Sequence, residues 1–411
     1  MNDSVNDIMA AAAKARSEGR LAEAIATLES LVERNPENAP GLNSLGLALL
    51  DAHRLEEAID VLRRAAVADP IAPPIWLNLA EAYRAAGHAD EELASLNQAL
   101  SIDPYILPAL LKKAQALETI GQIDAAVQAY RTLLAASPEG AQIPDAVRAA
   151  LAHGRELVRV ASARTAEDFR EQLTPVFAAH AAADFHRVRI YAQHRAGTRK
   201  VYQHEPTAGH FPFLPAIEFF DRALFPWFDQ LEQATAAICD ELRVLQAEDA
   251  HDFRPYVGFD PTQPVNQWAE LNHSSRWSAW FFWKDGVRQD ANCARCPVTA
   301  RLLDHLPMLD LPGKGPSVMF SVLAPKTRIP PHTGSSNVRT TVHLPLIVPP
   351  GCGFRVGGET REWRKGEAWA FDDTIEHEAW NDSDQRRIIL ILDAWNPLLT
   401  GPERAAVRAI G

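Results

Sequence analysis

Cysteine is scarce in this sequence, which holds four in 411 residues: Cys239, Cys293, Cys296 and Cys352. So few cysteines in so long a chain exclude a disulfide framework of the kind that supports small secreted domains. Cys293 and Cys296 form a single CxxC, without a second pair or a histidine at zinc spacing. This is weak evidence for a metal or redox site, and we expect ordinary reduced thiols.

Long apolar runs and an excess of basic charge are also missing. The chain has no apolar run of about 18 residues, the length expected of a membrane span. Its start, MNDSVNDIMAAAAKARSEGR, is polar and lacks the apolar core of a secretory signal. We therefore expect a cytoplasmic protein without a membrane partner. The net charge of −12 argues against a nucleic-acid binder, whose phosphate contacts need a basic face.

Length and composition indicate a globular chain of more than one domain. The 411 residues are enough for two or three domains with separate cores. The proportions of 47% hydrophobic and 23% charged residues are ordinary for globular proteins. Changes of pattern predict an α-solenoid at 1–140, a helical bridge at 141–250 and a strand-rich domain at 251–411.

The first 140 residues repeat with a period of 34. Prolines close the units, because proline cannot continue a helix, at Pro36, Pro70, Pro104 and Pro138. The turn inside each unit holds Gly19, His53, Gly87 or Gly121, and small residues recur at Ala12, Gly46, Ala80 and Ala114. Small side chains let two helices approach closely. The pattern is typical of tetratricopeptide repeats, and roughly three and a half units predict a stacked solenoid.

The concave groove of such a solenoid suits an extended ligand. We expect it to dock a peptide or the substrate protein. A spacer or a dimerisation surface is the alternative, because no particular ligand-reading residues stand out.

Residues 141–250 keep apolar side chains at three- and four-residue spacing but lose the repeat. We expect helices here, with the last one packing on the C-terminal domain. The proline-containing stretch QHEPTAGHFPFLP carries His204 and His210, which could be read as metal ligands. Scattered histidines in such a loop are more commonly polar surface, and we expect that reading to hold.

After Pro255, aromatic residues and period-two alternation replace the helical pattern. The alternation predicts strands at Ser317–Leu323, Val338–Val348, Glu367–Phe371, Glu378–Asn381 and Arg387–Trp395. Short turns separate these strands, as in an all-β sandwich or barrel. An aromatic run from Trp277 to Trp283 precedes them, and we assign most of it to the core.

Two histidines stand where strands meet turns, His332 and His377, and Arg387 follows ten residues after the second. Two imidazoles from different strands can hold iron and leave open positions, and a nearby cation can bind a carboxylate. This order is what a non-haem Fe(II), 2-oxoglutarate-dependent oxygenase needs. Most such enzymes place a carboxylate two residues after the first histidine, but here Gly334 occupies that position.

The surrounding motifs form a specific set. They are Ser321, the PHTG around His332, Asn337, Arg339, HLPL at 343–346, FDD at 371–373, His377, Arg387 and DAWNP at 393–397, with Trp277, WKDG at 283–286 and NCARCP at 292–297 upstream. This set resembles the aspartyl/asparaginyl β-hydroxylases over roughly residues 211–400. That family uses two protein ligands, with water in place of the carboxylate.

The resemblance implies a double-stranded β-helix (a cupin-like jelly roll) with flanking helices, Fe(II) on His332 and His377, and 2-oxoglutarate and O₂ as cosubstrates. Arg387 would pair with the distal carboxylate of 2-oxoglutarate, Ser321 would add a hydrogen bond, and His343 would contact the other end. A planar guanidinium suits a bidentate carboxylate clamp. Strand alternation turns Arg386 to the opposite face. A packed strand histidine is the alternative for His343.

By the same resemblance Trp277 and Arg339 contact the substrate. The family usually has an arginine where this chain has Thr341, and a polar amide where it has Ala279. A substrate carboxylate would therefore meet one cation fewer, which disfavours Asp relative to Asn or another residue.

Asp372 and Asp373 precede His377 by five and four residues. The resemblance makes them turn residues that hydrogen-bond and orient the site from behind the ligands. A direct metal ligand is the alternative.

The predicted function is hydroxylation of the β-carbon of an Asp or Asn side chain in a peptide or protein, with release of succinate and CO₂. Three alternatives remain open. The fold could hydroxylate a small molecule, or act as an iron halogenase in which Gly334 leaves room for chloride. It could also be a non-catalytic scaffold that binds partners through its repeats.

Overall fold

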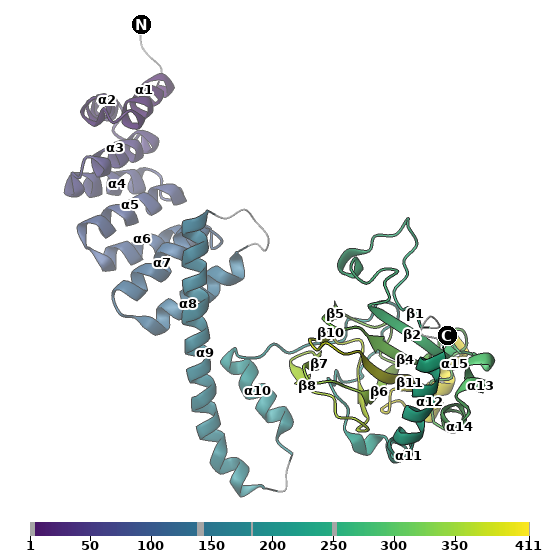
Figure 1. Ribbon diagram of the computed structural model, residues 1–411. Coiled ribbons are helices and arrows are strands. Elements are labelled where there is room, and N and C mark those ends of the chain that lie inside the picture. The colour runs from purple at the N-terminus through teal and green to yellow at the C-terminus, as the bar shows by residue number, and fades with distance from the viewer. Residues whose placement is uncertain (1–4, 138–143, 182–183, 249–252, 411) are drawn as a thin grey trace. The chain divides into compact units, whose positions relative to one another are not determined.

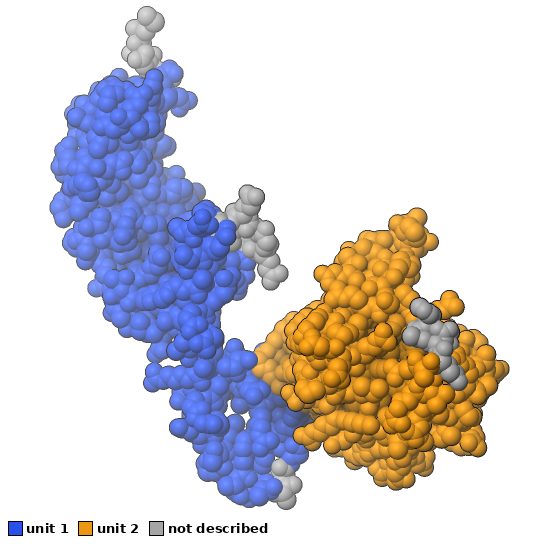
Figure 2. Space-filling model, viewed as in Figure 1, with its two compact units in different colours: residues 1–198 blue, residues 199–411 orange. Residues whose placement is uncertain are grey.

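The structure is a computed structural model that describes residues 5–137, 144–181, 184–248 and 253–410. The chain divides into two compact units, Met1–Thr198 and Arg199–Gly411 (Figures 1 and 2). Each unit has hydrophobic cores of its own. Pro138, the last of the four repeat prolines, lies outside the described residues.

Helical hairpins of the first unit follow the 34-residue period. The eight helices are α1 (Val5–Ser17), α2 (Leu21–Arg34), α3 (Ala39–Asp51), α4 (Leu55–Ala68), α5 (Pro73–Ala86), α6 (Ala89–Ile102), α7 (Leu107–Thr119) and α8 (Ile123–Ala136). They make four hairpins rather than three and a half. The first repeat has both of its helices, because α1 buries Ala12 and Ala15 and Ala12 joins the core of the following helices.

The recurring small and turn residues have the geometry that the period predicts. Gly19, Gly87 and Gly121 adopt φ of 75°, 80° and 77°, and His53 takes the same left-handed conformation at φ 56°. A Cβ built on Gly46 in α3 would lie 2.4 Å from Cγ of Leu62 in α4. The close approach of these two helices therefore requires glycine at this position.

The segment predicted as one helical bridge, 141–250, is divided after Thr198. Helices α9 (Asp145–Ala179) and α10 (His186–Ala196) belong to the first unit, because α9 continues its core through Leu151. Helices α11 (Phe228–Gln233) and α12 (Thr235–Glu248) belong to the second unit and pack on its large sheet. None of the described helices, the 35-residue α9 included, combines the length and apolar character of a membrane span.

Two antiparallel sheets form the second unit. The seven-stranded sheet has the order β1 (Arg254–Pro255), β2 (Trp277–Lys284), β4 (Val318–Leu323), β11 (Arg387–Trp395), β6 (Arg339–Ile347) and β9 (Trp369–Phe371), with β3 (Val287–Arg288) beside β2. The four-stranded sheet has the order β5 (Thr327–His332), β10 (His377–Asn381), β7 (Cys352–Val356) and β8 (Glu359–Arg361). The arrangement is jelly-roll-like, as the sequence predicts.

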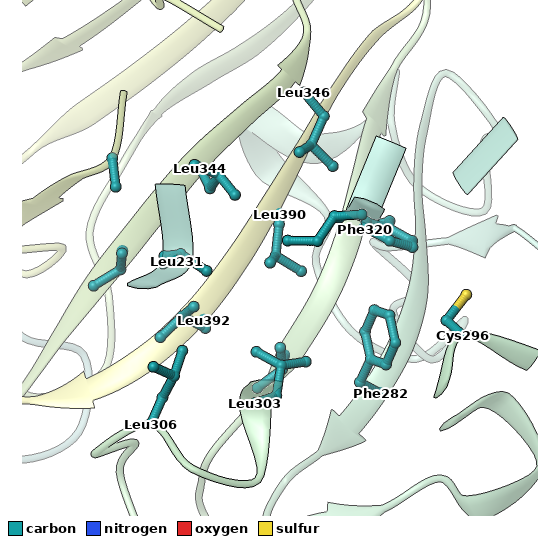
Figure 3. Close-up of a cluster of buried hydrophobic side chains, with 14 of the residues drawn as sticks. Leu231, Phe282, Cys296, Leu303, Leu306, Phe320, Leu344, Leu346, Leu390 and Leu392 are labelled. Atoms are coloured by element: carbon teal, nitrogen blue, oxygen red, sulfur yellow. The ribbon is translucent and has the colours of Figure 1, made fainter. Parts of the chain in front are cut away.

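Helices cover one face of the large sheet. Alternate residues of the central strands, among them Phe320, Leu344 and Leu390, pack in a cluster that Figure 3 shows together with Leu231 of α11. Helices α13 (Asp290–Arg295) and α14 (Pro297–Leu303) add further side chains, and α15 (Gly401–Ile410) ends the chain. All four cysteines are buried, and none of them is in a disulfide bond. The opposite face of the large sheet is left to the cavity described below.

The five predicted strands are confirmed, with bounds that shift by up to two residues. Strand β5 was not predicted, because Pro330 and Pro331 stand in its second half and indicate a turn. Proline is tolerated there because only part of the ladder between β5 and β10 is regular, with a register shift between His377 and Ala379.

Candidate active site

A cavity of about 520 Å³ is lined by side chains from both sheets. The large sheet contributes residues at every second position of its central strands: Met319 and Ser321 from β4; Arg339, Thr341 and His343 from β6; Arg387, Ile389, Ile391 and Asp393 from β11. The small sheet contributes Ile329, His332, Phe354, His377 and Ala379. Strand alternation therefore brings all the predicted metal, cosubstrate and substrate residues to the cavity, including Trp277 from β2 of the large sheet.

The two predicted metal ligands are neighbours on adjacent strands. His332 and His377 are register partners of β5 and β10, with ring centroids 4.1 Å apart. Each Nδ1 lies near a backbone carbonyl, at 2.8 Å from Pro330 O and 3.0 Å from Ile375 O. A carbonyl can only accept, so both Nδ1 atoms carry a proton and both Nε2 atoms keep a lone pair.

Burial keeps these imidazoles neutral. Desolvation lowers the pKa of His332, and desolvation together with the neighbouring His332 lowers the pKa of His377 well below its usual value. Neutral Nε2 donors oriented by carbonyls are what a metal centre requires. Among the described residues no three His, Cys, Asp or Glu side chains gather as a metal site.

The carboxylate of Asp373, from another loop, lies against Gly334, the second residue after His332. A Cβ built on Gly334 would lie 2.2 Å from Oδ2 of Asp373 and 2.6 Å from its Oδ1. Asp373 in turn accepts a hydrogen bond from Nη2 of Arg339 at 2.6 Å. Burial raises the pKa of Asp373 to about 6, against the opposing effect of Arg339. The Asp373 carboxylate thus occupies the position that a side chain at residue 334 would take.

Arg339 is shared between two acids. Besides Asp373, its Nη1 lies 3.5 Å from Oδ2 of Asp393, and both acids are about 5% exposed. The attraction of Asp373 raises the pKa of Arg339, so the guanidinium stays cationic. Its Nε and Oδ1 of Asp373 are buried without a hydrogen-bond partner. The Arg339 charge is therefore already compensated within the protein.

Arg387 is a buried cation at the other side of the cavity. Its side chain is 1% exposed, its Nε has no partner, and its guanidinium carbon lies 4.8 Å from the centre of the Trp363 ring. Burial lowers the pKa of Arg387 to about 10. Arg386, its neighbour in sequence, is exposed, as strand alternation predicts. The arrangement fits a ligand that brings its own carboxylate.

The other predicted cosubstrate residues flank Arg387. Ser321 Oγ accepts a hydrogen bond from Nε1 of Trp277 at 3.1 Å, so the hydroxyl proton remains available. His343 is 4% exposed and its Nδ1 has no partner. Burial, followed by the charge of Arg387, lowers its pKa well below the usual value. Ala279 is buried on β2, opposite Ser321.

Asp372 does not line the cavity but supports the loop before His377. Its Oδ1 accepts hydrogen bonds from the backbone N and Oγ1 of Thr374, at 3.0 and 2.6 Å. Its Oδ2 lies 3.0 Å from Nδ1 of His204. The expectation that His204 belongs to the polar surface is wrong: its side chain is 5% exposed, because the loop folds back onto the sheet, whereas His210 is exposed.

Sequence reasoning missed three residues of the site. Trp268 lies with its ring centroid 4.9 Å from that of His332, and Trp363 stacks near Arg387. His204 supports Asp372. All three come from segments without strand periodicity, so only the unusual density of tryptophan in the C-terminal half could have indicated the first two.

Comparison with known families matches residues 232–397 to the aspartyl/asparaginyl β-hydroxylases. Residues 10–73, 73–105 and 107–139 match tetratricopeptide repeats. These matches confirm the resemblance seen in the sequence motifs.

Individual relatives share part of the chain. The human aspartyl/asparaginyl β-hydroxylase is 37% identical over 141 residues, which cover 34% of this chain and 18% of that protein. An ornithine lipid ester-linked acyl 2-hydroxylase of Rhizobium tropici is 32% identical over 184 residues, covering 44% of this chain and 60% of that one. The matches thus span less than two thirds of either relative. The crystal structure of MamA is 21% identical, covers 38% of this chain and 84% of that one, and has a TM-score of 0.33.

Proposed function

Because the chain joins tetratricopeptide repeats to an aspartyl/asparaginyl β-hydroxylase domain, we propose that it is an Fe(II)- and 2-oxoglutarate-dependent dioxygenase acting on a peptide or protein. The observation that carries the proposal is the pair His332 and His377, whose Nε2 lone pairs are left free beside a buried, unpaired Arg387. The balanced reaction converts a substrate C–H bond, O₂ and 2-oxoglutarate into an alcohol, succinate and CO₂.

Bound iron would supply the activation of O₂ and the oxidation of an unactivated C–H bond. His332 and His377 would hold it, with their Nδ1 protons fixed by Pro330 O and Ile375 O. Arg387 would clamp the distal carboxylate of 2-oxoglutarate, and the Ser321 hydroxyl would donate to the same group. His343, which stays neutral, would contact the opposite end of the cosubstrate.

The substrate end of the cavity favours a side chain without a negative charge. Thr341 leaves Arg339 as the cation of β6, and two acids already surround Arg339. The buried Arg339 Nε and Asp373 Oδ1 offer one donor and one acceptor. A primary amide matches such a pair, whereas a carboxylate would place a second anion beside Asp373. The proposed reaction is therefore β-hydroxylation of Asn in preference to Asp, with Trp277 against the substrate.

A small apolar molecule is the second candidate substrate. Several cavity walls are apolar or aromatic: Val257, Phe259, Trp268, Met319, Ile329 and Ile391. The relative from Rhizobium tropici is named for a lipid acyl chain rather than a peptide. We rank the peptide first because the repeats provide a surface on which a polypeptide can dock.

The proposal is tested by anaerobic titration with Fe(II), with and without 2-oxoglutarate, while the visible metal-to-ligand charge-transfer band is recorded. The band is expected for the wild type and should be lost in His332→Ala and Arg387→Ala. Arg386→Ala is the matched control and should keep it. A wild type with neither a band nor affinity for 2-oxoglutarate would overturn the dioxygenase assignment.

A further inference from the structure

A segment that precedes the matched family region contacts the loop after His332 and the loop before His377, the two proposed metal ligands. Residues 204–211, here called the clamp segment, have almost no regular secondary structure. They lie outside residues 232–397, which match the hydroxylase family. The contacts to each loop are separate and can be followed in turn.

The first set of contacts holds the loop after His332. The backbone N of Thr207 donates to Gly334 O at 2.9 Å, and the backbone N atoms of Ala208 and Gly209 both donate to Ser335 O, at 2.9 and 3.0 Å. A short parallel bridge joins Gly209 to Ser336. The clamp segment therefore fixes residues two to four positions beyond the first ligand.

The fully buried side chain of Asn337 completes this set. Its Oδ1 accepts from the backbone N of Phe211 at 2.7 Å, and its Nδ2 donates to Phe211 O at 2.9 Å. Its backbone O accepts from Nδ2 of Asn396 at 3.0 Å. The end of the clamp segment is thus tied to the start of β6.

The second set of contacts holds the loop before His377. The backbone N of Glu205 donates to Thr374 O at 2.8 Å. His204 Nδ1 lies 3.0 Å from both Oδ2 of Asp372 and Oγ1 of Thr374, and its Nε2 lies 3.0 Å from Leu214 O. Asp372 and Thr374 are fully buried. One imidazole thus connects the clamp segment to the turn that leads into β10.

Every partner of the His204 ring is an acceptor. Leu214 O and the Asp372 carboxylate can only accept, and the Thr374 hydroxyl already donates its proton to Asp372 at 2.6 Å. This arrangement suits an imidazolium, in which Nε2 donates to Leu214 O and Nδ1 faces the buried Asp372 carboxylate at 3.0 Å. The other titratable ring facing it, that of exposed His210, stands edge-on at 5.5 Å. The Asp372 hydrogen bond accordingly raises the pKa of His204.

We propose that His204 and Asp372 are positioning residues, and that their ion pair, through the clamp segment, sets the geometry and metal affinity of the His332–His377 pair. The proposal rests on the metal site proposed above. The pair keeps the Asp372 carboxylate directed away from the cavity and holds the turn from which His377 starts. Breaking it leaves one buried charge without a partner, loosens the turn before His377 and, through the clamp segment, weakens the hold on the loop after His332.

The test is a titration of the metal-free full-length protein with Co(II), followed by tryptophan emission, since Trp268 lies 4.9 Å from His332. We expect His204→Gln and Asp372→Asn each to weaken Co(II) binding by about 10- to 100-fold, as residues behind metal ligands do. His210→Gln, on the same segment but exposed, is the matched control and should bind as the wild type does. Unchanged affinity in His204→Gln would overturn the proposal.

A double-variant cycle separates positioning from general loosening of the fold. If the two residues act as one pair, His204→Gln/Asp372→Asn should bind Co(II) no more weakly than the weaker single variant. If the losses of Co(II) affinity in the two single variants multiply in the double variant, the two residues act independently and not as a pair. At saturating metal, the visible spectrum of bound Co(II) should also change in the single variants, because the spectrum reports ligand geometry. If the single variants are less stable to unfolding but their Co(II) spectrum is unchanged, His204 and Asp372 support the fold and do not position the ligands.

Two measurements cover the remaining outcomes. If one single variant does not fold, the other single variant carries the test, and a wild-type affinity in that variant contradicts the proposal. If the wild type binds no Co(II), the metal site itself fails. Hydrogen exchange then tests whether His204 holds the clamp segment in place. His204→Gln should speed exchange at the Thr207, Ala208 and Gly209 amides, and unchanged exchange would contradict this role.

Discussion

The guanidinium carbon of Arg387 lies 4.8 Å from the centre of the Trp363 ring, and no carboxylate among the described residues pairs with this cation. A buried charge without a counter-ion is costly, so such a residue is retained at the expense of stability. The ring supplies part of the compensation through its negative face. The remainder is available to a ligand that carries its own negative charge.

Replacing Arg387 by Met should separate stability from cosubstrate binding. Without ligand, the variant should be at least as stable as the wild type, because the desolvated charge is gone. Its affinity for 2-oxoglutarate should fall by about 100-fold, the loss of roughly 3 kcal/mol of charge-assisted hydrogen bonding. Calorimetric titration and tryptophan-detected unfolding measure both quantities. Arg386→Met should change neither, and a cosubstrate affinity unchanged in Arg387→Met contradicts the assignment.

Adding a single methyl group at Gly334 should destabilise the site. The new Cβ would meet the Asp373 carboxylate at 2.2 Å, so we expect Gly334→Ala to cost about 1–3 kcal/mol in unfolding free energy. Asp373→Ser shortens the opposing side chain, so the double variant should lose less than the sum of the two single losses. Urea unfolding, followed by tryptophan emission, provides the comparison. Strict additivity would show that the two residues do not compete for space.

Stability below neutral pH should depend on His343. Burial lowers its pKa in the folded protein, whereas the unfolded chain takes up a proton near pH 6.5. As pH falls from 7.5 to 5.5 the unfolded state gains protons that the folded state does not, so this residue costs about 1 kcal/mol of stability. The wild type should therefore lose that much relative to His343→Gln. A stability difference independent of pH would contradict the neutral, buried assignment.

Peptides with Asn should be better substrates than matched peptides with Asp. Paired peptide pools that differ only in a central Asn or Asp should stimulate succinate release with a ratio of about tenfold or more, or roughly 1.4 kcal/mol. Thr341→Arg should reduce this ratio, because it adds a cation beside Arg339. Thr341→Gln, similar in length but uncharged, is the control and should not. Equal or better use of Asp by the wild type would show that Arg339 remains free to bind a carboxylate.

Replacing Gly46 by Ala should lower the stability of the repeats, although the same change usually stabilises a helix. In an exposed helix this change stabilises by about 0.5–1 kcal/mol. Here the added Cβ would lie 2.4 Å from Cγ of Leu62, so we expect a loss of about 1–3 kcal/mol instead. Hydrogen exchange of α3 and α4 in the full chain measures it, and Leu62→Ala should relieve part of it. Slower exchange in Gly46→Ala would contradict the packing.

Period-two alternation carries most of what the sequence predicts about the cavity. It separates Arg387 from Arg386 and places Ser321, Arg339 and His343 on one face, because successive strand residues point to opposite sides. The 34-residue period does the same for the repeats, since one helix pair repeats its contacts with the next. Local rules suffice for these features.

Contacts between distant, irregular segments could not be predicted in this way. His204 is buried by Asp372, which lies 168 residues further along the chain, and nothing in its own neighbourhood indicates this. Pro330 and Pro331 indicate a turn, yet β5 pairs with β10 and ends on His332. The contact between Trp363 and Arg387 depends on the packing of the whole domain and not on the local sequence.

The proposed metal ligands and the proposed cosubstrate residues lie on different sheets, and this has a thermodynamic consequence. Both proposed metal donors stand on the four-stranded sheet, whereas Ser321, His343 and Arg387 stand on the seven-stranded sheet. A cosubstrate that chelates the metal would therefore join the two layers, and separating the layers would release it. Metal and cosubstrate should then raise the unfolding temperature of this unit together more than the sum of their separate effects. With both ligands bound, this unit would unfold at a higher temperature as one cooperative block, with the ligands as part of the interface between its sheets.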